Sequence, residues 1–146
     1  MGNINREKLP SKGIIKAKAE TIIELENLLR FSYKYLDLKH STFNLDDCKE
    51  IDKYFYVFKE RQKLLCNESM QKLKATGSLS KSLRFHPIDW CKTQERKGFC
   101  FPKHDEIANE PYQFAISANE YGRVHGFIID CTFYIVWLDY GHQLYK

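Results

Sequence analysis

The strongest constraint on the fold lies in the last third of the chain, where three apolar segments follow one another with the periodicity of strands. Residues 112–117 and 124–129 alternate, and residues 132–138 form a nearly continuous β-branched and aromatic run. Turn-forming residues separate the segments at 119–122 and 129–131. The sequence therefore predicts three consecutive antiparallel strands. The last strand is expected in the interior of the sheet because it is the most apolar.

The first half of the chain has helical periodicity instead. Thr21 and Glu24 have the spacing of an N-terminal capping box, and the apolar residues behind them predict an amphipathic helix over 21–36. Asn44–Asp47 could cap a second helix. Its apolar stripe extends to about residue 75, and Asn67 is a candidate interruption.

These patterns predict one α+β domain over residues 19–146, with two N-terminal helices followed by an antiparallel β-meander. Residues 1–18 contain lysines, a proline and two glycines, and are expected to form a flexible basic arm. Residues 77–111 are punctuated by glycine and proline, which predicts loops with short strands, one of them at 83–85.

Charge and cysteine content narrow the class of protein. The chain has a net charge of +4, and the basic excess lies in residues 1–81, which could steer the protein to RNA or DNA phosphates. A solvated lysine-rich helix surface would explain the same charge. No apolar run is long enough for a membrane span, and no secretory signal is recognisable, so no membrane partner is expected. Five cysteines without a CxxC pair favour free thiols and a cytoplasmic location.

The C-terminal end concentrates the side chains that could do chemistry. Arg123 and His125 are two residues apart on one predicted strand, so they face the same side, and a neighbouring strand could bring His142 and Tyr145 alongside. Arginine can hold a phosphate, histidine can move protons near neutral pH, and tyrosine can stack on a base. This set would suit RNA cleavage by the 2′-hydroxyl of the RNA itself, a reaction for which no metal or other cofactor is expected. Satisfied surface residues at strand edges would give the same pattern.

The order of these elements resembles the C-terminal half of the RelE/ParE superfamily of toxins. The resemblance covers residues 110–146 and rests on four patterns: Tyr112-x-Phe-x-Ile-Ser, Gly-Arg-Val-His-Gly-Phe-Ile-Ile-Asp, Phe-Tyr-Ile-Val-Trp-Leu-Asp and the terminal His-x-x-Tyr. It implies a RelE-like fold and a translation-inhibiting endoribonuclease. Arg123 would contact the phosphate, and His142 and Tyr145 would be acid/base and stacking residues; His125 has no fixed counterpart. The implied partners are RNA or the ribosome and an antitoxin protein.

Two other interpretations stay open at this point. The same fold could be a non-catalytic binding module of a mobile-element or defence system, which the slightly acidic C-terminal half favours. Alternatively, His86, Cys91, Cys100 and His104 supply four nitrogen or sulfur ligands within about 20 residues, which would suit a small zinc-stabilised nucleic-acid binder. A nucleophilic Cys91 paired with His86 is a separate possibility that ranks below zinc binding.

Overall fold

A five-stranded mixed sheet forms the centre of the molecule. The structure is a computed structural model and describes residues 12–146. The elements are α1 (Lys12–Glu26), β1 (Arg30–Ser32), α2 (Ile51–Cys66), α3 (Met70–Thr76), β2 (His86–Pro87), α4 (His104–Ile107), β3 (Pro111–Ala115), β4 (Arg123–Ile129) and β5 (Thr132–Asp139), with short 3-10 turns at Gly77–Leu79 and Trp90–Lys92. The strand order is β1-β5-β4-β3-β2. Among the described residues, no helix has the length and apolarity needed to cross a membrane.

The α+β class predicted from the sequence is confirmed, and β3, β4 and β5 pair antiparallel in succession. The sheet as a whole is not purely antiparallel, because β1 pairs with β5 in parallel. β5 has a neighbour on each side, as its apolar sequence predicted.

The helix predicted over residues 21–36 is wrong in its second half. α1 begins at Lys12 and ends at Glu26, and residues 30–32 form β1. Leu29 is buried and the Phe31 ring packs against Phe114 and Phe133, so burial against the sheet outweighs the helical spacing. Residues 12–18 are therefore helical rather than a loose arm, and the rest of the predicted arm lies outside the described residues.

The second predicted helix is divided into α2 and α3 by residues 67–69, at the interruption expected near Asn67. The Ser69 side chain accepts a hydrogen bond from the Lys72 amide and thereby begins α3. The predicted cap at Asn44–Asp47 is wrong, because α2 begins at Ile51 and has no side-chain cap. The short strand expected at 83–85 lies instead at His86–Pro87, where it pairs with β3.

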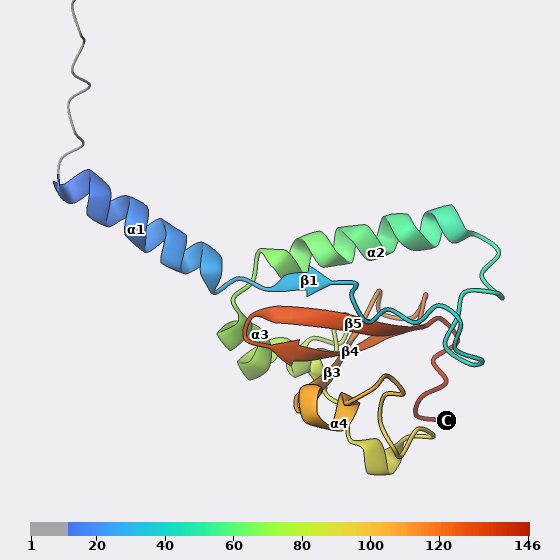
Figure 1. The fold of residues 1–146 in the computed structure, drawn as a ribbon. Coiled ribbons are helices and arrows are strands. Elements are labelled where there is room, and N and C mark those ends of the chain that lie inside the picture. The colour runs from blue at the N-terminus through green and yellow to red at the C-terminus, as the bar shows by residue number, and fades with distance from the viewer. Residues whose placement is uncertain (1–11) are drawn as a thin grey trace, which may run out of the picture.

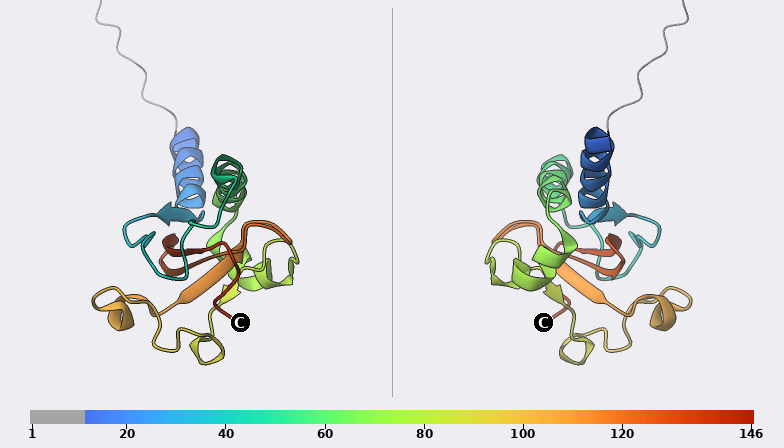
Figure 2. Two further views of the ribbon diagram at one scale, coloured as in Figure 1. Left: turned by 90° about the vertical axis from the view of Figure 1, so that its right-hand side faces the viewer. Right: turned by 90° about the vertical axis from the view of Figure 1, so that its left-hand side faces the viewer.

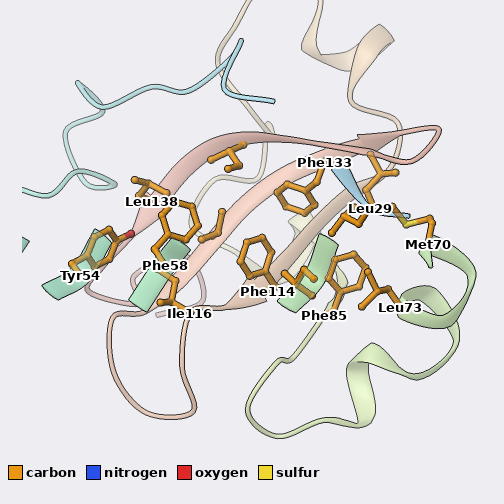
Figure 3. Close-up of a cluster of buried hydrophobic side chains, with 14 residues drawn as sticks. Leu29, Tyr54, Phe58, Met70, Leu73, Phe85, Phe114, Ile116, Phe133 and Leu138 are labelled. Atoms are coloured by element: carbon orange, nitrogen blue, oxygen red, sulfur yellow. The ribbon is translucent and has the colours of Figure 1, made fainter. Parts of the chain in front are cut away.

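Two apolar clusters cover the two faces of the sheet. α2 lies over one face (Figure 1), and the buried side chains of α2 and α3 meet those of the strands in the cluster of Figure 3, which includes Tyr54, Phe58, Phe114, Phe133 and Leu138. The second cluster lies on the opposite face and contains Phe43, Phe99, Phe127, Trp137 and Leu144, which come from long loops, the sheet and the C-terminal tail. α1 extends beyond the end of the sheet, away from the rest of the molecule (Figure 1), and the views turned by 90° show it above the sheet (Figure 2).

A β-bulge between β4 and β5 decides which side chains reach the second face. The register is regular from Ile129↔Thr132 to Gly126↔Ile135, and then shifts so that His125 lies opposite Trp137. Val136 is the additional residue on β5, and it reverses the alternation beyond it. As a result Asp139 lies opposite Arg123, on the same face as His125.

Candidate anion-binding site

A concave site lies where the beginning of β4 meets the end of β5. We call it the cationic pocket; it has a volume of about 380 Å³ and is lined by Arg84, Ala118, Asn119, Tyr121, Gly122, Arg123, Tyr140, Gly141 and His142. Two similar tripeptides, Tyr-Gly-Arg at 121–123 and Tyr-Gly-His at 140–142, supply six of these residues. The described residues that line the pocket include three basic side chains and no carboxylate, so its chemistry favours an anion.

Arg123 is the most buried of the three basic residues, with 5% of its surface exposed. Its Nη1 donates to the Gly122 carbonyl at 3.2 Å, whereas its buried Nε has no hydrogen-bond partner. Burial, and then the nearby Arg84, lower the pKa of Arg123. A buried guanidinium is costly unless its charge is compensated, and an anion in the pocket would compensate it.

The backbone around the cationic pocket is held in an unusual conformation. In the described chain, five non-glycine residues have a positive φ, and three of them line this pocket: Arg84 at 49°, Tyr121 at 64° and His142 at 52°. Such conformations cost free energy and cluster at functional sites. Gly122, with a φ of 71°, lies so close to β5 that a Cβ there would be 1.9 Å from the Asp139 carbonyl oxygen.

Asp139 fixes the turn that carries His142. Its carboxylate accepts hydrogen bonds from the amides of Gln143 at 2.7 Å and Leu144 at 3.0 Å. Leu144 is fully buried in the second apolar cluster, so the tail is anchored immediately beyond the pocket. Burial, and then the positive charge of Arg123, lower the pKa of His142, which favours a neutral imidazole at pH 7.

His125 lies beneath the pocket rather than in its wall. The side chain is completely buried, and Nε2 donates to the Asp139 carboxylate at 3.0 Å. Burial lowers the pKa of His125 despite the opposing effect of Asp139. His125 therefore supports Asp139, which in turn holds the turn with His142. Its Nδ1 has no partner.

Tyr145 is separated from the other three predicted site residues. Its hydroxyl accepts a hydrogen bond from the Asp89 amide at 3.3 Å, and the ring packs against the second apolar cluster. The structure thus brings Arg123 and His142 into one pocket, places His125 behind it, and directs Tyr145 elsewhere.

Sequence reasoning missed Arg84, Tyr121 and Tyr140. The similarity of the two tripeptides, Tyr-Gly-Arg and Tyr-Gly-His, could have indicated the tyrosines. Nothing in the sequence around Arg84 indicates a site.

The four residues considered for zinc are not gathered in the structure. His86 Nε2 lies 2.8 Å from the Gln113 side-chain amide nitrogen, and His86 Nδ1 lies 2.9 Å from the Pro87 carbonyl. In the described part of the chain, one group could hold a metal by proximity, and it consists of His40, Glu95 and Cys100. Cys100 is the one residue that this group has in common with the four predicted zinc ligands.

The hydrogen bonds of His40 argue against that group as a metal site. Its Nδ1 accepts from the amides of Thr42 at 3.1 Å and Phe43 at 3.2 Å, so a neutral ring carries its proton on Nε2, which faces Glu95 at 3.8 Å. Burial, and then Glu95, raise the pKa of Cys100, which favours the thiol over the thiolate that binds metals. The group is better described as a polar contact between two loops.

Comparison with protein-family models, curated proteins and solved structures finds no match to this chain. The chemistry of the cationic pocket is therefore the main indication of function.

Proposed function

We propose that the cationic pocket binds a phosphate of single-stranded RNA and that the protein is a RelE-like endoribonuclease. The observation that carries the proposal is the buried Arg123, which has an unpaired N–H and lines the pocket together with Arg84 and His142. Arg84 and Arg123 would neutralise the phosphate. The resemblance of residues 110–146 to RelE/ParE toxins suggests messenger RNA on the ribosome as the substrate, with inhibited translation as the result.

The same pocket supplies groups for cleavage by the 2′-hydroxyl. A neutral His142 can accept the 2′-hydroxyl proton while the 2′-oxygen attacks phosphorus and the bond to the 5′-oxygen breaks. Arg123 would stabilise the charge that develops on the phosphorane, where electrostatic help is largest. The pKa of Tyr140 is raised, first by desolvation, so its phenol stays protonated and can donate to the leaving 5′-oxygen. The products are a 2′,3′-cyclic phosphate and a 5′-hydroxyl.

The test is induced expression in a bacterial host with total RNA mapped for new 5′ ends. Wild type should arrest growth and produce such ends, and Arg123→Ala should reduce cleavage by about 100-fold, the effect of removing one charge-stabilising donor. Arg84 is exposed, so Arg84→Ala should fold normally and still weaken cleavage. Arg96→Ala removes an equal charge outside the pocket and should have no effect.

Folded wild-type protein that leaves RNA intact would contradict the cleavage reaction. Retained binding of RNA in that case would identify the alternative, a non-catalytic binding module. One observation favours that alternative: His142 is the one histidine among the pocket's described lining residues, so histidine chemistry there has a single participant.

A further inference from the structure

A second cavity adjoins the cationic pocket across two shared tyrosines. This cavity, the tyrosine-flanked pocket, has a volume of about 410 Å³ and is lined by Glu50, Lys53, Glu120, Tyr121 and Tyr140. Tyr121 and Tyr140 line both cavities, so they form the boundary between them. If the phosphate of a ligand occupied the cationic pocket, the part of the ligand attached to that phosphate would lie at the tyrosine-flanked pocket.

The two boundary tyrosines are held in place by the core. The buried Tyr54 ring makes edge contacts with both, at centroid distances of 6.0 Å to Tyr121 and 5.9 Å to Tyr140. Tyr140 also interacts with Cys48, and Tyr121 with Lys53. Aromatic rings fixed in this way are suitable for stacking with a nucleobase, because little conformational freedom is lost on binding.

Glu120 is the hydrogen-bond acceptor available in the tyrosine-flanked pocket. Its backbone is fixed in the β3–β4 turn, where its amide donates to Ser117 Oγ at 3.1 Å and its carbonyl accepts from the same hydroxyl at 2.7 Å. Glu50 is paired with Lys53 at 3.7 Å. Within the described chain, by contrast, the Glu120 carboxylate has no hydrogen bond and no ion pair within 4 Å. Its interaction with Lys53 is of longer range and helps to raise the pKa of that lysine, so the carboxylate oxygens can accept hydrogen bonds from a ligand.

We propose that the tyrosine-flanked pocket binds the nucleobase next to the phosphate in the cationic pocket and that Glu120 selects guanine. This inference rests on the proposed phosphate binding. An ionised carboxylate accepts hydrogen bonds and cannot donate them. Guanine offers two adjacent donors, N1–H and the 2-amino group, to its two oxygens. Adenine and cytosine offer one amino group each, whereas the single N–H of uracil lies between two carbonyl oxygens that a carboxylate repels.

Calorimetric titration of the full chain with small ligands tests the inference without requiring cleavage. The ligands are guanosine 3′- and 5′-monophosphate, the two uridine counterparts and inorganic phosphate. We expect the better guanosine isomer to bind about tenfold more tightly than its uridine counterpart, the discrimination of one bidentate base contact. Both nucleotides should bind more tightly than inorganic phosphate.

Substitutions then assign the effect to its residues. Glu120→Gln should reduce the preference for guanosine to about twofold or less, whereas Glu60→Gln, on the exposed part of α2, should leave it unchanged. Tyr140 lines both cavities, so Tyr140→Leu should weaken the binding of every nucleotide by more than it weakens the binding of inorganic phosphate. Circular dichroism checks that each variant is folded.

Two different failures can be distinguished. Equal affinity for guanosine, uridine and inorganic phosphate, with all three weakened by Arg84→Ala, would overturn the base pocket and retain the phosphate site. No detectable binding of any of the ligands would overturn both.

Discussion

Asp139 links the interior of the sheet to the cationic pocket. It accepts two amides of the tail and one imidazole proton, and it is fully buried. These hydrogen bonds hold its pKa below the ordinary value despite burial, so the carboxylate stays ionised. His125 is thus a positioning residue for the turn that carries His142, and its predicted catalytic role stays untested. Neighbouring charges of Arg123 and His86 oppose protonation of His125.

Stability should therefore depend on the protonation of histidine. The pKa of His125 is lowered in the folded protein, and that of His142 is lowered in the same direction. Below about pH 6.5 the unfolded chain binds protons that the folded protein excludes, so the free energy of unfolding decreases as the pH falls. Thermal denaturation followed between pH 7.5 and 5 should show a decreasing Tm.

The variant His125→Phe removes the buried imidazole and therefore its contribution to the pH dependence of stability. Its Tm at pH 7.5 should be lower than that of wild type because Asp139 loses a partner, and its decrease toward pH 5 should be smaller. If the Tm of the variant decreased as steeply, other titratable groups would be the cause of the pH dependence.

At the scale of elements, the site depends on the close approach of β4 to β5. The bulge at Val136 turns Asp139 toward Arg123 and His125, and Gly122 lets the backbones meet at the mouth of the pocket. The tripeptides Tyr-Gly-Arg and Tyr-Gly-His are similar in sequence, but the backbone conformations of their glycines differ. Gly122 has a positive φ, and Gly141 does not.

Alanine substitutions at these two glycines form a matched pair. A Cβ at Gly122 would collide with backbone oxygens of Asp139 and Tyr140, whereas a Cβ at Gly141 would meet the movable Gln143 side chain at 3.0 Å. Gly122→Ala should lower the unfolding free energy by about 3 kcal/mol or more, and Gly141→Ala by about 1 kcal/mol or less. Chemical denaturation measures both, and equal losses would contradict the close approach.

For the whole molecule, charge distribution sets how an RNA would bind. The first 81 residues have the basic excess, yet the cationic pocket is built largely from the less basic C-terminal part, with Arg84, Arg123 and His142. Because His142 is expected to be neutral at pH 7, two arginines remain to contact phosphate. Binding that depends on this pocket should therefore respond weakly to salt.

The salt dependence of binding measures how many phosphates the protein neutralises. For a short single-stranded RNA, one neutralised phosphate predicts a slope of roughly −0.7 in a plot of log K against log salt concentration. Arg123→Ala should weaken the binding without making this slope steeper. A much steeper slope, unchanged in the variant, would instead indicate binding over the basic N-terminal half.

The sequence by itself determined the α+β class, the order of β3, β4 and β5, the interior position of β5, and Arg123 and His142 as candidates, because periodicity and residue type are local properties. Tertiary structure alone decided that residues 30–32 are a strand, since a parallel partner 100 residues away outweighs local spacing. It also decided the burial of His125, the separation of Tyr145 and the entry of Arg84 into the pocket. The bulge at Val136 reverses the strand alternation that sequence reasoning assumes, and no local pattern marks it.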